Sequence, residues 1–288
     1  MSTALAILGP GVLGLSAAQW AAECGLETRL LGRDKGHAEV GMREIHARWG
    51  RALAKGHLSS EARDRGVALL SAATFSPESL EGVSAFLEAL PEAADLKAPP
   101  LNAALRWGSS DMLLLSGTSA LPIAGLAQRA GAEGRLLGFH LFVPVPRMAV
   151  VEMAIPEGIS NAWVDRARSL GLALQKRVVR VRDQPGFAAA RMALAQGLEA
   201  IRLVEAGVAT AEDLDALMTL GYGHPVGPLE LSDRVGLDLR LRIAEGLVAH
   251  GEDRFLPPRL LKAKVASGSV GLKSGQGFHT WTPDGKRT

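Results

Sequence analysis

The feature that most constrains the fold is a glycine motif close to the N-terminus. GPGVLG, residues 9–14, follows a short apolar stretch at 3–8 and precedes a segment rich in small residues. This order is typical of a buried parallel strand, a tight turn and a helix. Gly9 would make the turn, Gly11 would let the backbone approach a pyrophosphate, and Gly14 would let the helix pack on the strand. The helix N-terminus favours anions, so we expect a dinucleotide site here, and a plain glycine turn is the alternative.

Strand-like and helix-like segments alternate over the first part of the chain. The predicted strands cover 3–8, 27–31, 85–90, 112–117, 135–142, 149–155 and 176–181. The predicted helices cover 12–24, 36–55, 93–106, 121–131 and 160–172. This alternation predicts an α/β fold with a Rossmann-like, doubly wound and mostly parallel sheet.

The pattern changes at DQPGF, residues 183–187, where a proline and a glycine interrupt it. Beyond this point only helical periodicity remains. The predicted helices cover 187–206, 211–221, 227–234, 236–250 and 257–267. We therefore expect a dinucleotide-binding domain at 1–182 and an all-helical C-terminal domain at 183–288.

Composition excludes several classes of protein. The net charge is only +2 and aromatic residues make up 5%, so neither charge nor composition favours nucleic acid as a partner. One cysteine, Cys24, excludes a disulfide framework, and the scattered histidines predict no metal site. No stretch approaches the about 20 apolar residues that a membrane span needs. The expectation is a cytoplasmic enzyme or binding protein that does not bind a membrane.

The end of the second predicted strand bears on which dinucleotide is bound. NAD sites usually place an Asp or Glu there to hold the ribose 2′-hydroxyl, but the expected position is Gly32. Arg33 follows directly, and an arginine here can pair with a 2′-phosphate. Asp34 could still supply the carboxylate if the strand end is shifted, and Arg33 could be a solvated loop charge. The sequence favours NADP over NAD.

Two polar residues mark the ends of HLFVPVPRMAVVE, residues 140–152. His140 and Glu152 both lie in apolar strands, where a lone histidine is more often a satisfied core residue than a catalyst. A buried carboxylate is costly unless it is paired. An antiparallel turn at the prolines would set the two side by side, so that Glu152 fixes the imidazole tautomer and His140 can move a substrate proton.

Hydroxyl groups follow another apolar strand in SGTSAL, residues 116–121. Ligand contacts are common at the carboxyl ends of parallel strands. Ser119 could therefore bond a substrate hydroxyl or a nicotinamide. It could equally be the N-cap of the helix that begins near Leu121, and the sequence leaves both roles open.

In these motifs and their order the chain resembles the L-3-hydroxyacyl-CoA dehydrogenases, of the 3-hydroxybutyryl-CoA dehydrogenase type. The resemblance covers nearly the whole length. It rests on GPGVLG at 9–14, LEALPEAADLK at 87–97, SGTSALPI at 116–123, GRLLGFHLFVPVPRMAVVEM at 134–153, DQPGFAAARM at 183–192, GHPVGPLELSDRVGLD at 223–238 and GLKSGQGF at 271–278. It implies an NAD(P)-dependent enzyme for a CoA thioester, with a C-terminal domain that closes over the substrate and forms a homodimer.

The resemblance also implies roles for single residues. His140 would be the catalytic base or acid, Glu152 its orienting partner, and Ser119 a contact to substrate and nicotinamide. Cofactor contacts are implied for Glu92, Lys97 and Lys273. Lys55 falls near the place of a CoA-binding lysine, and it would share a helix face with Arg48 and Arg51 that also suits plain solvation.

The chain departs from the family pattern where side-chain amides are expected. Val143 occupies the position of the asparagine that follows the catalytic histidine in the family. Ala190 occupies the position of a second active-site asparagine, and Gly117 that of an asparagine before the serine. Losing one directed hydrogen-bond donor near a reacting oxygen costs about 3–4 kcal/mol of transition-state stabilisation. A shifted substrate or a reshaped site is expected from these changes.

Three functions follow from these observations. The first is hydride transfer between NAD(P) and C3 of a 3-hydroxyacyl-CoA or a related 3-hydroxy acid. The second is a dehydrogenase for a hydroxy acid without CoA, such as a sugar acid or a carnitine-like compound. The third is a dinucleotide-binding protein that has lost its chemistry, which Val143 and Ala190 favour and the retained His140, Glu152 and Ser119 oppose.

Overall fold

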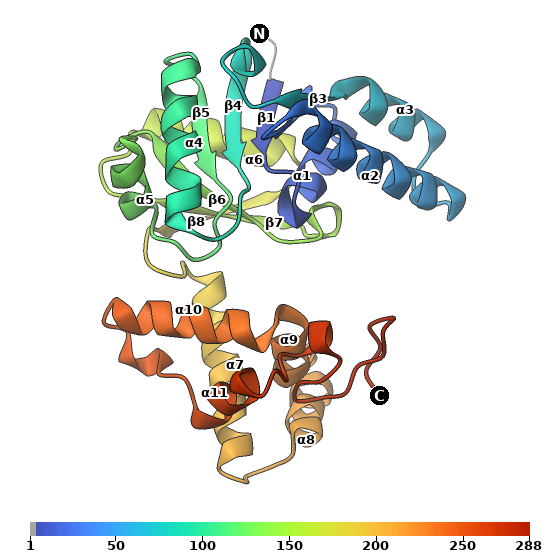
Figure 1. Ribbon diagram of the computed structural model, residues 1–288, viewed down its shortest axis with the longest axis vertical. Coiled ribbons are helices and arrows are strands. Elements are labelled where there is room, and N and C mark those ends of the chain that lie inside the picture. Colours follow the sequence, from blue (N-terminus) through green and yellow to red (C-terminus); the bar gives the residue numbers. More distant parts are fainter. Residues whose placement is uncertain (1–3) are drawn as a thin grey trace. The chain divides into compact units, whose positions relative to one another are not determined.

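The computed structural model describes residues 4–288, which divide into two compact units. The first unit ends at Phe187 and the second begins at Ala188, whereas the sequence placed the boundary at residue 183. The predicted first strand included Thr3, which lies outside the described residues. Figure 1 shows the α/β unit and the helical unit, which are described separately below.

The first unit is built on a sheet with the strand order β3-β2-β1-β4-β5-β6-β7-β8. The strands are β1 Ala4–Leu8, β2 Thr28–Gly32, β3 Leu70–Thr74, β4 Val83–Glu88, β5 Leu113–Ser116, β6 Leu136–Leu141, β7 Val150–Ile155 and β8 Arg177–Arg182. Neighbouring strands from β1 to β6 are parallel, β7 is antiparallel to β6, and β8 is parallel to β7. The predicted doubly wound, mostly parallel sheet is confirmed.

Helices cover both faces of this sheet. They are α1 Val12–Glu23, α2 Lys35–Ala54, α3 Ser60–Leu69, α4 Ala94–Trp107, α5 Ile123–Ala130 and α6 Asn161–Ala173. One core layer packs α1, α2 and α6 against one face, and a second layer packs α4 and α5 against the other. Successive strand residues alternate between the two layers, as Leu5 and Ala6 do, because side chains along a strand point to opposite faces.

The sequence missed two adjacent elements, α3 and β3. Residues 60–69 carry no clear apolar stripe, since only Gly66 is buried in α3. Strand β3 is short, lies at the edge of the sheet and consists of LSAAT, which lacks the β-branched and aromatic residues that mark strands. The strand predicted at 85–90 is β4 at Val83–Glu88, so residues 89 and 90 lie beyond the strand end.

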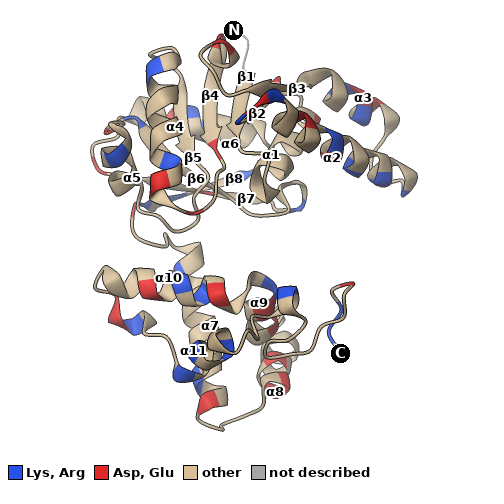
Figure 2. Cartoon of the chain, in the orientation of Figure 1, with Lys and Arg blue, Asp and Glu red and all other residues tan. Residues whose placement is uncertain are grey.

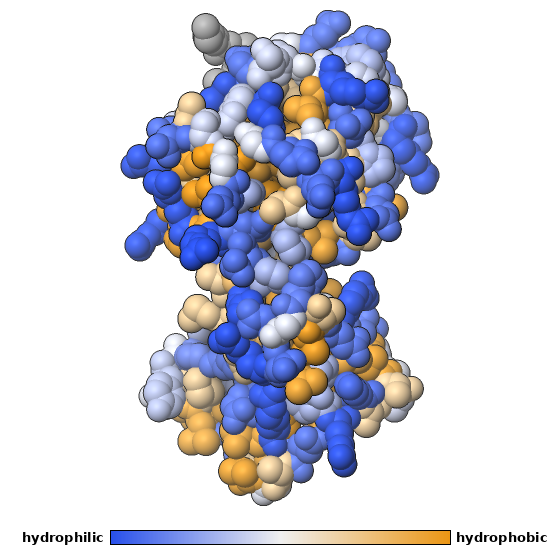
Figure 3. Space-filling model, turned by 90° about the vertical axis from the view of Figure 1, so that its left-hand side faces the viewer, coloured by the Kyte–Doolittle hydropathy of each residue, from blue (hydrophilic) through white to orange (hydrophobic). Residues whose placement is uncertain are grey.

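The second unit is helical, as predicted. Its helices are α7 Ala189–Glu205, α8 Ala211–Ala216, the π-helical turn Leu217–Gly221, α9 Pro228–Val235, α10 Leu237–Ala249 and α11 Arg259–Ala266. Its apolar core includes Leu198, Leu229 and Phe255. Hydrophobic side chains also reach the surface of this unit, where orange atoms lie among polar ones (Figure 3).

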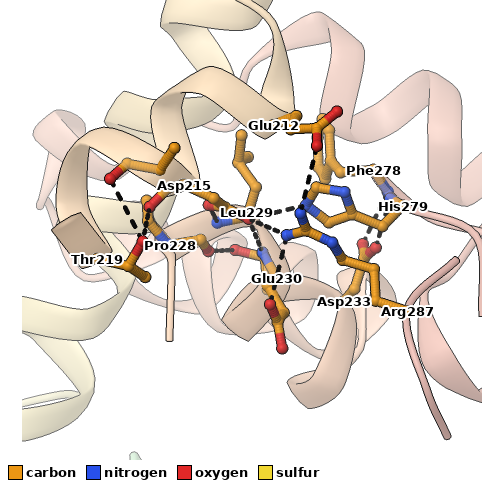
Figure 4. A network of polar contacts seen from close by, with 12 residues as sticks. Glu212, Asp215, Thr219, Pro228, Leu229, Glu230, Asp233, Phe278, His279 and Arg287 are labelled. Carbon is orange, nitrogen blue, oxygen red and sulfur yellow. Dashed lines mark hydrogen bonds and ion pairs between the residues drawn. The ribbon is translucent and has the colours of Figure 1, made fainter. Parts of the chain in front are cut away.

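Buried carboxylates fix the C-terminal tail of the second unit (Figure 4). Asp233 accepts hydrogen bonds from the backbone N–H groups of Phe278 and His279 and from Nε1 of Trp281. Asp215 lies 2.8 Å from Nε2 of His279 and also accepts the first N–H groups of α9. The tail is therefore a packed part of the unit, although it contains little regular structure.

Charged residues of both signs are distributed over both units (Figure 2). Among the described residues, none of the helices has the length and apolar character needed to cross a bilayer.

Candidate active site

The glycine motif forms a close-packed turn between β1 and α1. A Cβ added to Gly14 would lie 1.9 Å from the carbonyl oxygen of Gly9, so no other residue fits there. At Gly11, by contrast, an added Cβ would meet none of the described residues within 4 Å. The N-terminus of α1 has no side-chain cap and no acidic residue in its first turn. The free N–H groups and the positive helix end thus face open space, which suits an anionic phosphate.

A hollow of about 440 Å³ lies against this turn. Its lining comprises Gly9, Pro10, Gly11, Val12, Leu13, His37, Ala89, Leu90 and Pro91. The residues after β4 therefore form its second wall. These features fit a nicotinamide dinucleotide, whose pyrophosphate would lie on the N-terminus of α1.

The turn between β2 and α2 has no room for an acidic side chain at Gly32. A Cβ there would lie 2.8 Å from both the amide nitrogen of Ala38 and the carbonyl oxygen of Asp34. Asp34 is the N-cap of α2, and its carboxylate accepts the N–H of His37, which holds the pKa of Asp34 below its usual range. The side chain of Arg33 is 82% exposed and pairs with Asp34, at 3.3 Å. The guanidinium of Arg33 therefore extends into solvent at the end of β2, where it can contact a ligand.

His140 and Glu152 lie side by side, as the sequence analysis expected. They are directly opposite residues of the antiparallel pair β6–β7. His140 Nδ1 lies 3.0 Å from Glu152 Oε2, and their side chains are 13% and 4% exposed. Because a carboxylate only accepts hydrogen bonds, Nδ1 carries the proton and Nε2 is left as the basic nitrogen.

The turn between these two strands is anchored to the helix of the glycine motif. Val145 donates its N–H to Ser16 Oγ of α1 at 2.9 Å and accepts from Lys176 Nζ at 2.7 Å. Burial lowers the pKa of the Lys176 ammonium. Val143 precedes Pro144 through a cis peptide bond and is 46% exposed, so it is not a core residue. Neither Ser16 nor Lys176 was expected, because each bonds to a backbone group of Val145 that is far away in the sequence.

Aromatic rings flank the imidazole of His140. The ring of Phe142 has its centroid 4.4 Å away, and that of Phe187 lies at 6.4 Å. Phe187 is buried and has a positive φ of 45°, an uncommon conformation for a residue with a bulky side chain. The rings leave the histidine in partly apolar surroundings, where its hydrogen bond to Glu152 is stronger than in water.

Ser119 lies in the loop after β5, where Glu92 holds it. Glu92 Oε1 accepts the N–H of Ser119 at 2.9 Å and lies 3.3 Å from its hydroxyl oxygen. The same oxygen accepts from the Thr118 hydroxyl and the Ala120 N–H. Helix α5 has no side-chain cap of its own from this loop. Ser119 is therefore not the N-cap of α5, and the capping alternative is wrong.

A buried ion pair lies beneath this loop, and the sequence missed half of it. Lys97 Nζ lies 2.9 Å from Glu88 Oε1 and 3.4 Å from Glu92 Oε2, and its side chain is 1% exposed. Glu88 is fully buried and also accepts from the Ser116 hydroxyl at 2.6 Å. Lys97 thus faces groups of the chain itself, and its expected contact with the cofactor stays a prediction.

Both units match models of one protein family. Residues 4–184 match the 3-hydroxyacyl-CoA dehydrogenase NAD-binding domain, and residues 186–281 match the C-terminal domain of the same enzymes. The chain belongs to the 3-hydroxyacyl-CoA dehydrogenase family. It is therefore an oxidoreductase of the dehydrogenase type with an NAD-binding first unit.

Relatives within this family are similar over almost their full length. A 3-hydroxybutyryl-CoA dehydrogenase of Mycobacterium tuberculosis is 34% identical over 96% of this chain and 97% of its own. The human mitochondrial hydroxyacyl-coenzyme A dehydrogenase is 30% identical over 96% and 90%. The crystal structure of (S)-3-hydroxybutyryl-CoA dehydrogenase PaaH1 from Ralstonia eutropha gives a TM-score of 0.93 at 29% identity, over 98% of this chain and 100% of that one.

Two further lysines were singled out by the family resemblance, one in each unit. Lys55 is the exposed C-cap residue of α2, and its expected helix neighbours Arg48 and Arg51 both pair with Glu44. Lys273 belongs to the second unit, where it forms an ion pair with Asp238.

The departures from the family pattern have different surroundings. At Gly117 an added Cβ would lie 2.7 Å from Leu13 Cδ2 and 3.1 Å from the Glu88 carbonyl oxygen, so an asparagine would displace Leu13. Val143 is largely exposed, and Ala190 lies in the first turn of α7 in the second unit. Of the three departures from asparagine, the surrounding packing explains only the one at Gly117.

Proposed function

We propose that the chain is an NAD(P)-dependent dehydrogenase that transfers a hydride between the dinucleotide and C3 of a 3-hydroxyacyl-CoA. The observation that carries this proposal is the His140–Glu152 pair at the carboxyl end of β6. The neighbouring strand is β5, and Ser119 lies in the loop after it. A bound nicotinamide would supply the hydride acceptor or donor. The names of its relatives favour 3-hydroxybutyryl-CoA or a thioester of similar length.

His140 moves the proton in this proposal. In the oxidation direction Nε2 takes the proton of the 3-hydroxyl, and in the reduction direction it returns one to the developing alkoxide. Glu152 keeps Nδ1 protonated and stabilises the imidazolium that forms, over the 3.0 Å hydrogen bond. The hydroxyl of Ser119, oriented by Glu92, would bond the same substrate oxygen.

We infer a preference for NADP. The support is the crowded backbone at Gly32, the use of Asp34 as a helix cap, and the exposed guanidinium of Arg33. A 2′-phosphate would replace Asp34 as the partner of Arg33. Comparing kcat/KM for NADPH and NADH tests this: a preference for NADPH that falls in Arg33→Ala is expected, and a preference for NADH contradicts it.

The CoA part of the substrate would meet the first unit near Lys55. This lysine is exposed and no ion pair to it is found among residues 4–288, unlike Arg48 and Arg51 on the same helix. The predicted result of Lys55→Ala is a higher KM for acyl-CoA with kcat largely retained, because the phosphates lie far from the reacting carbon.

The second unit would carry the homodimer contact and help to close over the substrate. Its exposed apolar side chains include Leu217, Leu220 and Tyr222, which are 60%, 87% and 78% exposed on and after the π-helical turn. Apolar residues gathered in one short segment are typical of a subunit interface. A monomer in sedimentation velocity at micromolar concentration would contradict this part of the proposal.

The first test is reduction of acetoacetyl-CoA, followed at 340 nm with NADPH and NADH, against free acetoacetate. Activity that depends on CoA supports the proposal, whereas higher kcat/KM for free hydroxy or oxo acids supports the dehydrogenase without CoA. Tight dinucleotide binding with no turnover of any 3-oxoacyl substrate supports the non-catalytic protein, which the absence of asparagines at Val143 and Ala190 favours. His140→Ala should abolish turnover while dinucleotide binding survives.

A further inference from the structure

The segment Asp183–Phe187, which ends the first unit, packs along the loop that carries Ser119. Asp183 Oδ1 accepts the N–H of Ile123 at 2.8 Å, and Oδ2 accepts that of Ala124 at 2.7 Å. Three residues on, Gly186 donates its N–H to the carbonyl oxygen of Ala120 at 2.8 Å. The segment is thus bonded to backbone groups on the C-terminal side of Ser119.

Asp183 supplies the cap that α5 lacks. The N-cap residue of this helix is Pro122, which has no side chain able to accept a hydrogen bond. A helix leaves its first N–H groups without partners inside the helix, and a carboxylate at this end also meets the positive end of the helix dipole. A helix of eight residues is marginal alone, so the start of α5 and the loop before it depend on this distant side chain.

The other end of the same segment reaches the histidine. Phe187 is buried, its ring centroid lies 6.4 Å from that of His140, and its N–H is bonded to the Gln184 carbonyl oxygen. One five-residue turn therefore contacts both the Ser119 loop and the His140 ring. Glu92, which precedes the Ser119 loop in the chain, also bonds to this loop by accepting the N–H of Ser119.

We propose that Asp183 is a positioning residue for the reaction, which acts by fixing Ser119 relative to His140. This inference rests on the proposed function. Asp183 touches neither substrate nor dinucleotide; it sets where the Ser119 hydroxyl stands when the substrate oxygen binds. Errors of about 1 Å in such a placement cost up to about 100-fold in rate.

The test compares two variants at opposite ends of α5. Asp183→Asn keeps the size of the side chain but turns one acceptor oxygen into a donor that faces a backbone N–H. Asn102→Ala is the matched control, because the Asn102 amide donates to the Ala130 carbonyl oxygen at 2.8 Å, in the last turn of the same helix. Each variant disturbs a side-chain hydrogen bond to one end of α5. Only Asp183→Asn does so at the end that follows the Ser119 loop.

The expected result is a lower kcat with little change in KM. For acetoacetyl-CoA reduction, Asp183→Asn should lower kcat about tenfold or more while the KM for the dinucleotide changes less than about threefold. Asn102→Ala should keep kcat within about twofold at a similar loss of thermal stability. Phe187→Leu, which shortens the ring beside His140, provides a second variant with the same expected split if Asp183→Asn does not fold.

The outcomes separate this inference from the function on which it rests. With an active wild-type chain, a folded Asp183→Asn variant near wild-type kcat overturns the inference alone. Where Asp183→Asn does not fold, Phe187→Leu near wild-type kcat overturns it. Equal losses of kcat in Asp183→Asn and Asn102→Ala also overturn it, since the effect then follows helix stability. A wild-type chain inactive on every 3-oxoacyl and 3-hydroxyacyl substrate overturns the proposed function and the inference with it.

Discussion

Replacing Glu152 by glutamine removes one charge and changes few atoms. The side chain of Glu152 is 4% exposed and opposes His140 across β6 and β7, so the variant leaves the strand pairing in place. A glutamine can also turn its NH₂ group toward Nδ1, which would then have to accept a hydrogen bond. That tautomer carries its proton on Nε2 and cannot take one from a substrate hydroxyl.

The size of the effect follows from the bond that is lost. A hydrogen bond to a charged group contributes about 1.5–3 kcal/mol, and each 1.36 kcal/mol is tenfold in rate. With Nδ1 and Oε2 at 3.0 Å and both side chains largely buried, Glu152→Gln should lower kcat about 10- to 150-fold. The KM for the dinucleotide should stay within about twofold, because Glu152 is not part of the glycine turn.

The assay is 3-hydroxybutyryl-CoA oxidation followed at 340 nm, at a temperature where circular dichroism shows every variant to be folded. Asp215→Asn is the matched control, since Asp215 is a buried carboxylate bonded to a histidine, His279, at 2.8 Å in the second unit. It should lose stability and keep kcat within about twofold. Glu152→Gln at more than half of wild-type kcat would refute the reasoning.

Three further predictions concern other parts of the chain. Gly14→Ala should abolish dinucleotide binding in calorimetry, because its Cβ would lie 1.9 Å from the Gly9 carbonyl oxygen. Burial lowers the pKa of Arg240 to about 10, and its Nε finds no hydrogen-bond partner among the described residues. Arg240→Met should therefore raise the free energy of unfolding by about 1–3 kcal/mol at pH 7 in urea titrations. Burial also raises the pKa of Cys24 to about 11, so alkylation by iodoacetamide at pH 8 should be about 100-fold slower than for a free thiol and should accelerate toward pH 11.

The sequence was most informative where a local pattern determines the geometry. The glycine turn can be predicted because its close contacts admit no side chain at Gly14. The pairing of His140 with Glu152 can be predicted because a short turn between two apolar strands leaves few registers, and a shift of one residue would move every side chain to the other face.

The sequence was least informative where the partners of a polar residue are set by the tertiary fold. Glu88, Lys176 and Asp183 form their contacts with groups that tertiary folding brings close, and no spacing in the chain marks those partners. Lys97 could be assigned by resemblance to a cofactor contact, but its burial in an ion pair depends on Glu88 from the preceding strand. The helix α3 and strand β3 were missed because neither buries an apolar stripe of its own.

The central claim is that His140 moves the substrate proton, and the most direct measurement is kcat of His140→Gln for acetoacetyl-CoA reduction. His279→Gln is the control, since this histidine also pairs with a buried carboxylate, Asp215. The account predicts a loss of about 10²–10⁴-fold in His140→Gln, unchanged dinucleotide affinity, and near wild-type kcat in the control. Turnover by His140→Gln within about tenfold of wild type would contradict the claim.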